Sequence, residues 1–352
     1  MDTRNYDLAV GACSISADTA VHAAMDHYLA SVATAQPGKA DVEVSVRVDP
    51  AAVAATRQTW ASVPPSEMRR SHPGHRYRAW ATDKSATVLL PARTSDHTIT
   101  VDGHHILVHA QRAEVAATVG VRIVRQLIMR GGENRGGRAV HAAAVDLDGT
   151  GILIGGYPGA GKSSVVTRLL ETHHARPVSN DRTVLIPGEP GWRAVGVPLA
   201  WRFTPEGLHA SHGLATSISR GTPQRGHRLI DGKIELTPHE VDEALACRAM
   251  ATTMIGRLVI LARLPDDAAG PPDIGFVRQR LDFGVSDFFA EDWLGIAAHL
   301  PGRQATASPV EQENWWAHLA ATMPTRVLSW THPCELDRVA AAVAGAASGH
   351  RS

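Results

Sequence analysis

The chain contains little cysteine and no segment that would anchor it in a membrane. Its three cysteines, Cys13, Cys247 and Cys334, lie far apart and show neither disulfide nor metal-ligand spacing. No apolar run approaches the roughly 20 residues that a membrane-spanning helix needs. The N-terminus, Met1–Asn5, is polar and shows no signal peptide. We therefore expect a reduced, cytoplasmic protein with no membrane partner.

An excess of basic charge is also absent, since 35 Lys and Arg residues balance 35 Asp and Glu residues. A general nucleic-acid binder usually carries a basic surplus, so no nucleic-acid partner is expected. Lysine itself is scarce, and the chain has only Lys39, Lys84, Lys162 and Lys233. A lysine retained in such an arginine-rich chain can mark a place that needs a compact ammonium group. Lys162 is the first candidate for such a place, because it lies in the glycine-rich segment described next. Lys233 is a weaker candidate.

A glycine-rich segment carries the strongest functional signal. Residues Gly156 to Ser163 fit the phosphate-binding pattern G-x-x-x-x-G-K-[ST], with a β-type run before them and a helical pattern after them. Glycines let backbone N–H groups turn towards phosphate oxygens, and the helix N-terminus adds partial positive charge. The residues expected to bind nucleotide are Gly156, Tyr157, Pro158, Gly159, Ala160, Gly161, Lys162, Ser163 and Ser164. Lys162 is expected to reach the outer phosphates of ATP, and the Ser163 hydroxyl to ligate Mg²⁺.

The segments around this loop predict a mixed sheet in an α/β domain. A strand over Ala139–Val145 and a turn at Asp148-Gly149 lead back into the strand Gly151–Gly155, so the strand before the loop should pair antiparallel with the loop strand. Arg176–Ser179 predicts the next strand, which ends at Asn180-Asp181. A hairpin is then expected between Thr183–Ile186 and Trp192–Val197.

The N-terminal part predicts a smaller β-rich α+β domain over residues 1–132, and the glycine-rich patch 131–137 predicts the boundary with a second domain over 133–352. We found no catalytic pattern in residues 1–132. The elements expected there are strands at 7–12, 42–48, 77–81, 86–90, 97–101 and 105–108, a helix over 19–35, a loop over 62–75, a hairpin turn at 102–103, and a helix over 114–129 that ends at Gly131-Gly132.

The C-terminal part predicts fewer regular elements. Residues 211–232 lack sustained periodicity and are interpreted as a loop, whose basic groups either close over phosphates or simply belong to a solvated linker. The elements expected after it are a strand at 233–236, a helix start at 237–240, a strand at 258–264 and helices near 311–323 and 335–347.

His141, the hairpin, the phosphate loop and Asn180-Asp181-Arg182 together resemble the HPr kinase/phosphorylase family, whose P-loop domain is related in architecture to phosphoenolpyruvate carboxykinase. Members have a histidine in the strand before the loop, then G-x-x-G-x-G-K-S, then a strand that ends in Asp-Asp-Arg. The close match runs from Val140 to Arg182. A looser likeness extends from residue 233 to the C-terminus, and residues 1–132 do not match that family's N-terminal domain.

The resemblance implies an HPr-kinase-like P-loop domain that uses ATP and Mg²⁺ to phosphorylate a hydroxyl, either a serine of a peptide or protein or the alcohol of a small metabolite. It implies catalytic roles for His141, Lys162, Asn180 and Asp181, metal ligation by Ser163 and Asp181, and assembly as a homo-oligomer. The family's first aspartate is Asn180 here, and an amide cannot accept a proton as a carboxylate does. We expect Asn180 to orient the acceptor through its amide N–H, and the alternative is that it stands in for a catalytic base that is no longer present. An ATP-binding regulator or scaffold without transfer activity, and a simple P-loop ATPase, are the alternatives.

Overall fold

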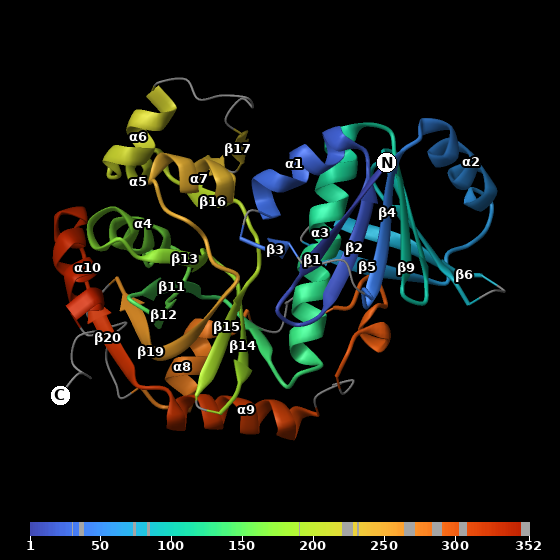
Figure 1. The fold of residues 1–352 in the computed structure, drawn as a ribbon. Coiled ribbons are helices and arrows are strands. Elements are labelled where there is room, and N and C mark those ends of the chain that lie inside the picture. Colours follow the sequence, from blue (N-terminus) through green and yellow to red (C-terminus); the bar gives the residue numbers. More distant parts are fainter. Residues whose placement is uncertain are drawn as a thin grey trace. The chain divides into compact units, whose positions relative to one another are not determined.

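The protein is described by a computed structural model, which covers residues 1–29, 31–34, 39–72, 75–82, 85–189, 191–219, 228–230, 232–263, 272–283, 291–302 and 308–345. The chain forms two compact α/β units (Figure 1). Unit 1 comprises Met1–Gly136 and Val285–Ala305, and unit 2 comprises Gly137–Gly284 and Thr306–Ser352. The first crossing between the units falls within the glycine-rich patch 131–137. The return of Val285–Ala305 to unit 1 was not predicted.

Unit 1 is built on a nine-stranded mixed sheet. Its strands are β1 (Asp2–Asp7), β2 (Ala12–Ala17), β3 (Ala33–Thr34), β4 (Val42–Val48), β5 (Glu67–His72), β6 (His75–Ala81), β7 (Thr87–Pro91), β8 (His97–Asp102) and β9 (His105–Ala110), in the order β3-β1-β2-β4-β9-β8-β7-β6-β5. Its helices are α1 (Thr19–Leu29), α2 (Pro50–Trp60), α3 (Ala113–Glu133) and the 3₁₀ turn η2 (Ala297–His299). The sheet pairs β2, β4 and β9 in parallel, and α3 packs against α1, β4 and β9.

Three predictions for unit 1 are wrong in part. Residues 8–11 form the turn between β1 and β2, where the N–H of Leu8 donates to the carbonyl of Gly11, and only the end residues of the predicted strand 7–12 are in strands. The predicted loop 62–75 contains the edge strand β5. The helix predicted over 19–35 corresponds to α1, which ends at Leu29. The strand at 42–48 and the hairpin at Asp102-Gly103 are confirmed.

The helix α3 continues through Gly131 and Gly132, which were expected to end it. A Cβ at Gly131 would lie 2.9 Å from the carbonyl oxygen of Val10, so the glycine permits the helix to pack directly on the turn between β1 and β2. Gly131 therefore serves close packing, which a local C-cap pattern does not distinguish from chain termination.

Unit 2 contains two sheets. The strands of the larger sheet are β10 (Arg138–Val140), β11 (Ala143–Leu147), β12 (Thr150–Gly155), β13 (Arg176–Ser179), β14 (Thr183–Pro187), β15 (Trp192–Gly196), β19 (Thr252–Ala262) and β20 (Thr325–Ser329). Their order is β10-β14-β15-β19-β12-β11-β13, and β20 also pairs with β19. The smaller sheet has the order β16-β18-β17, from Trp201–Phe203, Lys233–Leu236 and Arg228–Ile230. The sheets are mixed, as predicted.

Helices cover both faces of the larger sheet. The helices of unit 2 are α4 (Lys162–His173), α5 (Pro205–His209), α6 (His212–Ser219), α7 (Pro238–Ala244), α8 (Ile274–Leu281), α9 (Pro309–Thr322), α10 (Leu336–Gly345) and the 3₁₀ turn η3 (Pro333–Glu335), and α5 packs against β16 of the smaller sheet. Alternate residues of β12 point to opposite faces. Ile152 and Ile154 pack in a core with α4 and α10, and Leu153 packs in a second core with α8 and α9. The loop strand is therefore buried on both faces.

The predicted hairpin before the phosphate loop is confirmed, because β11 pairs antiparallel with β12. The strand expected over 139–145 is broken, however, and His141 and Ala142 lie between β10 and β11. A second break at residues 180–182 separates β13 from β14. Since β10 pairs with β14 and β11 pairs with β13, the two interrupted strands run beside each other. The two breaks therefore face each other, and the Thr183 hydroxyl donates to the carbonyl of Ala142.

The C-terminal predictions are largely confirmed. β18 and the start of α7 lie as expected, and Thr237 and Glu240 form a capping box there. The strand expected at 258–264 begins earlier, since β19 starts at Thr252, and α9 and α10 match the two expected helices. The predicted loop 211–232 contains α6 and β17, and its residues 220–227 and 231 lie outside the described part of the chain.

Candidate active site

The phosphate-loop pattern forms a compact turn between β12 and α4. Gly156, Gly159 and Gly161 have φ angles of 145°, 85° and 93°, which L side chains rarely adopt. The N–H of Ala160 donates to the carbonyl of Tyr157 at 3.0 Å, and α4 starts at Lys162 directly after the loop. The three glycines therefore supply the backbone conformation that this connection needs.

Donors from within unit 2 bind the carbonyl groups of the loop. The Nζ of Lys162 donates to the carbonyl of Gly156 at 2.9 Å. The indole N–H of Trp330 donates to Ala160 at 2.9 Å, and Nη1 of Arg263 donates to Gly159 at 3.3 Å. In a trans peptide the C=O and the following N–H point in opposite directions. The N–H groups of Tyr157 and Gly161 consequently point away from Lys162 and Trp330, respectively.

Lys162 is the buried cation of this site, with 7% of its surface exposed. Burial lowers the pKa of its ammonium to about 8, with a small further lowering from Lys233, and the attraction of Asp181 opposes both. A bound polyphosphate would supply the negative charge that a buried ammonium lacks.

His141 and Asp181 form a hydrogen-bonded pair across the two strand breaks. The Nε2 of His141 lies 3.1 Å from Oδ1 of Asp181, and the contact selects the tautomer that donates. Burial raises the pKa of Asp181. The hydrogen bond and charge of His141 outweigh this effect together with the charges of Arg182 and Lys162, so the pKa is lowered to about 2. Asp181 is therefore an anion at every physiological pH.

An aromatic side chain supports this pair. The ring of Phe283 stacks on the His141 imidazole at 5.4 Å between centroids, and the buried Arg182 guanidinium lies 5.2 Å from the same ring. The N–H of His141 donates to the carbonyl of Leu281, at the end of α8. The position of His141 is therefore set by α8 and the residues after it, which the local motif did not reveal.

Asn180 has a structural contact that was not foreseen. Its side chain is 5% exposed, and its amide Nδ2 donates to the carbonyl of Ala200 at 2.9 Å. One of the two amide protons is thus used within the protein, which leaves at most one for the proposed orientation of an acceptor. A carboxylate at this position would place an oxygen against the Ala200 carbonyl. The asparagine therefore suits the surrounding backbone better than the aspartate of the family pattern.

The donor set fits a magnesium ion that is shared with a nucleotide. Ser163 is half-buried in the first turn of α4, and the Asp181 carboxylate interacts electrostatically with Lys162, the residue before Ser163. Across the described residues, no group of three or more His, Cys, Asp or Glu side chains gathers to hold a metal. Mg²⁺ is usually held by one or two protein oxygens together with substrate phosphates and water. Ser163 and Asp181 would be those two ligands.

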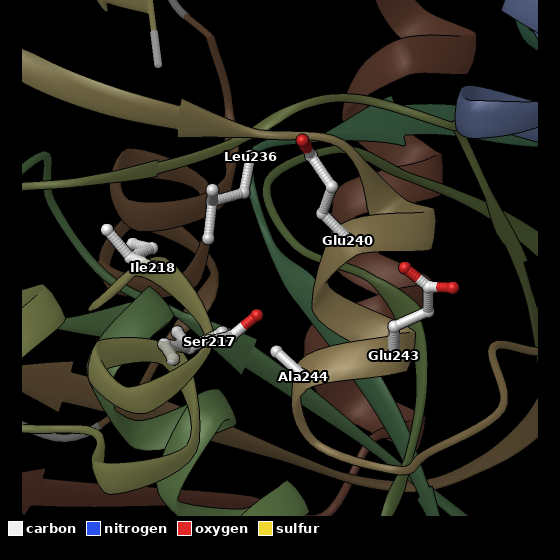
Figure 2. A pocket seen from close by; sticks show the side chains of 7 residues that line it. Ser217, Ile218, Leu236, Glu240, Glu243 and Ala244 are labelled. Atoms are coloured by element: carbon white, nitrogen blue, oxygen red, sulfur yellow. The ribbon is translucent and has the colours of Figure 1, made fainter. Parts of the chain in front are cut away.

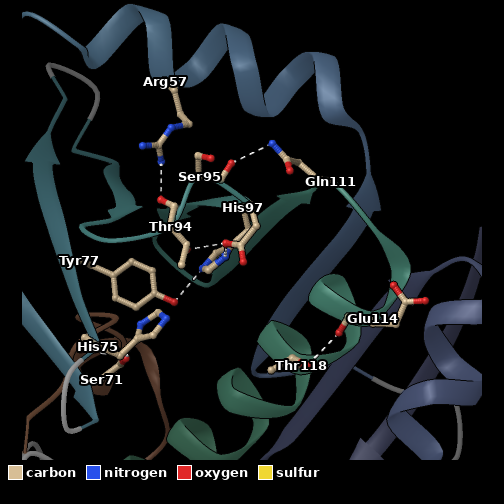
Figure 3. Close-up of polar contacts among 11 residues, drawn as sticks. Arg57, Ser71, His75, Tyr77, Thr94, Ser95, His97, Gln111, Glu114 and Thr118 are labelled. Atoms are coloured by element: carbon tan, nitrogen blue, oxygen red, sulfur yellow. Dashed lines mark hydrogen bonds and ion pairs between the residues drawn. The ribbon is translucent and has the colours of Figure 1, made fainter. Parts of the chain in front are cut away.

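Two further features lie away from this site. A small cavity of about 10 Å³, enough for about one water molecule, is lined by α6, β18 and α7 and by none of the loop residues (Figure 2). In unit 1, the buried His97 accepts a hydrogen bond from the Tyr77 hydroxyl at 2.8 Å and contacts Asp96 at 2.7 Å (Figure 3). Burial lowers the pKa of His97 to about 4 against the effect of Asp96, so the imidazole is neutral and its nitrogens are satisfied.

The chain matches no family model in a scan of known protein families, and it matches no curated protein. Within the described residues, no helix is both long enough and apolar enough to cross a membrane. Because neither comparison finds a match, the roles of the site residues rest on the geometry of the site.

Proposed function

We propose that unit 2 is a Mg²⁺- and ATP-dependent kinase that transfers the γ-phosphoryl group to a hydroxyl, of a peptide, a protein or a small metabolite. The observation that carries the proposal is the convergence of a glycine loop, a buried ammonium and an ionised aspartate that is held by a histidine. An HPr-kinase-like arrangement of the P-loop domain is part of the same proposal. The antiparallel strand before the loop and the positions of His141 and Asp181 support it.

The chemistry of phosphoryl transfer suits these groups. The transition state is loose and asks mainly for positioning and for positive charge on the phosphoryl oxygens. Lys162 would neutralise the outer phosphates, and the N–H groups of the loop would bind their oxygens. With a pKa of about 2, Asp181 is a weak base, so we assign it to metal binding and to orientation of the acceptor hydroxyl. Ser163 and Asp181 would hold Mg²⁺, which would supply positive charge to neutralise the phosphates.

Incubation of the protein with γ-labelled ATP, Mg²⁺ and a panel of serine peptides and alcohol metabolites tests the proposal. Labelled acceptor is the expected result. Release of labelled phosphate to water alone would indicate an ATPase, and binding without turnover would indicate an ATP-binding regulator. Lys162→Ala and Asp181→Asn should each reduce transfer by about 100-fold or more.

The exposed Lys39 and Asp148 supply matched controls, because Lys39→Ala and Asp148→Asn make the same chemical changes on the surface. Both control variants should retain wild-type turnover. If Lys162→Ala also retained it, the loop would not be the phosphate site.

A further inference from the structure

Three parallel strands end at the same edge of the larger sheet of unit 2. β12 and β20 both pair in parallel with β19, and the carboxyl ends of parallel strands meet on one side of a sheet. The phosphate loop follows β12, Arg263 follows β19 and Trp330 follows β20. The N–H of Trp330 donates to the carbonyl of Ala262, which extends the pairing by one residue. The sheet itself thus delivers Arg263 and Trp330 to the loop.

Trp330 contacts the loop closely. Its side chain is 5% exposed, and its indole N–H donates to the carbonyl of Ala160. A Cβ at Gly161 would lie 2.1 Å from Cζ2 of the indole, so the backbone of Gly161 lies directly on the ring. The guanidinium of Arg263 lies 5.5 Å from the centre of the ring while it donates to Gly159. Three consecutive loop residues, Gly159 to Gly161, are therefore held by these two side chains.

This contact fixes the direction of one peptide group. The carbonyl of Ala160 points at the indole, so the N–H of Gly161 in the same peptide plane points to the opposite side. If the peptide rotated, the carbonyl oxygen would face the ligand and would repel a phosphate. The indole N–H removes this alternative, because rotation would leave both groups without their hydrogen bond.

We propose that Trp330 is a positioning residue of the phosphate loop: it holds the Ala160–Gly161 peptide so that the Gly161 N–H faces the phosphate chain of a nucleotide. The inference rests on the proposed nucleotide site and adds a residue that the loop motif does not contain. Trp330 therefore acts on the binding of the polyphosphate part of the ligand. The nucleobase has no part in the contact.

Calorimetric titration of Trp330→Phe with ATP-Mg²⁺ and with inorganic triphosphate-Mg²⁺ tests the role. The substitution keeps an aromatic ring and removes the N–H donor. We expect both ligands to bind about five- to ten-fold more weakly, as for the loss of one hydrogen bond. An effect on ATP alone would contradict the proposal, because the base would then be the affected part. Equal binding to wild type would also overturn it.

Trp192→Phe is the matched control. Trp192 is a buried indole of the same unit, 2% exposed, and its N–H donates to the Thr322 hydroxyl, away from the loop. Its variant should lose similar thermal stability and bind triphosphate within about two-fold of wild type. Equal weakening in both variants would assign the effect to general destabilisation. Absence of ATP binding by the wild type would instead reject the proposed function, so the two failures are distinguishable.

The exposed Arg263 gives a second variant if Trp330→Phe does not fold. Arg263→Ala removes the donor to Gly159 and the cation above the indole. We expect about three-fold weaker triphosphate binding that persists at roughly 0.5 M salt, where long-range attraction between exposed charges is screened. A defect that disappears at this salt concentration would show only a loss of attraction and would contradict the positioning role.

Discussion

At the scale of single residues, the candidate site is a set of charges whose protonation states are fixed by their neighbours. Asp181 is ionised because His141, Arg182 and Lys162 outweigh the effect of its burial. Lys162 is held less firmly, since burial lowers its pKa to about 8. The lysine of the loop therefore titrates near the working pH of an enzyme.

The contact of Asn180 predicts the effect of restoring the family's aspartate. Asn180→Asp should lower stability by about 3 kcal/mol at neutral pH, because the carboxylate would be buried against the Ala200 carbonyl and beside Asp181. Transfer activity should fall. Chemical denaturation at several pH values measures the loss of stability. Burial raises the pKa of the new carboxyl. The stability cost of the substitution should therefore shrink as the pH falls and the carboxyl becomes protonated, because the protonated acid can donate to the carbonyl of Ala200. A variant that is as stable as wild type and faster would show that Asn180 replaces a catalytic base.

The lowered pKa of Lys162 predicts that nucleotide affinity depends on pH. Phosphates bind the protonated ammonium, so above pH 8 binding must take up a proton and the affinity should fall, by up to about tenfold per pH unit. Asp181 does not titrate in this range. Calorimetry in buffers of different ionisation enthalpy measures the proton uptake. Lys162→Arg should bind with little dependence on pH, because arginine stays charged. Constant wild-type affinity across this range would contradict the assignment.

At the scale of elements, the sequence predicted most strands of unit 2 well but missed the interruption at 141–142. The alternation and turn signals gave β12, β13 and the β14–β15 hairpin with nearly correct bounds. The break at 180–182 agrees with the predicted strand end at Asn180-Asp181 and the next predicted start at Thr183, whereas the break at 141–142 was not predicted. Both breaks lie between strands that pair with each other, which is a long-range property. The loop glycines and Lys162 form a local motif and were predicted. Trp330, Arg263 and Phe283 reach the site from distant segments, and no local pattern marks them.

Gly131, one of the glycines inside α3, leads to a prediction about helix packing. Alanine usually stabilises a helix relative to glycine by roughly 1 kcal/mol. At Gly131, however, the added Cβ would lie 2.9 Å from the Val10 carbonyl, so Gly131→Ala should destabilise the protein by about 1–3 kcal/mol. Gly345→Ala, near the end of α10, is the control, since a Cβ there meets nothing within 4 Å. Thermal unfolding should separate the two variants, and a stabilised Gly131→Ala would refute the packing role.

At the scale of the whole molecule, the chain crosses three times between two units, at 136–137, 284–285 and 305–306. The sequence predicted one boundary near the first crossing. The second unit is therefore interrupted, because the segment that follows Phe283 returns to unit 1. All of the candidate site residues nevertheless belong to unit 2. Unit 1 has its own sheet and a buried polar cluster around His97, whose hydrogen bonds are made within the unit.

This division predicts where a nucleotide protects the backbone. Hydrogen exchange with and without ATP-Mg²⁺ should show slower exchange in the loop Gly156–Ser163, in the breaks 141–142 and 180–182, and at 328–331, because binding stabilises the state that holds the ligand. The amides of α3 and β4, which pack within unit 1, should exchange at unchanged rates. Lys162→Ala should abolish the protection, and Lys39→Ala should leave it unchanged. Protection within α3 or β4 that disappears with Lys162→Ala would show that unit 1 responds to the nucleotide, and the site could then no longer be assigned to unit 2 alone.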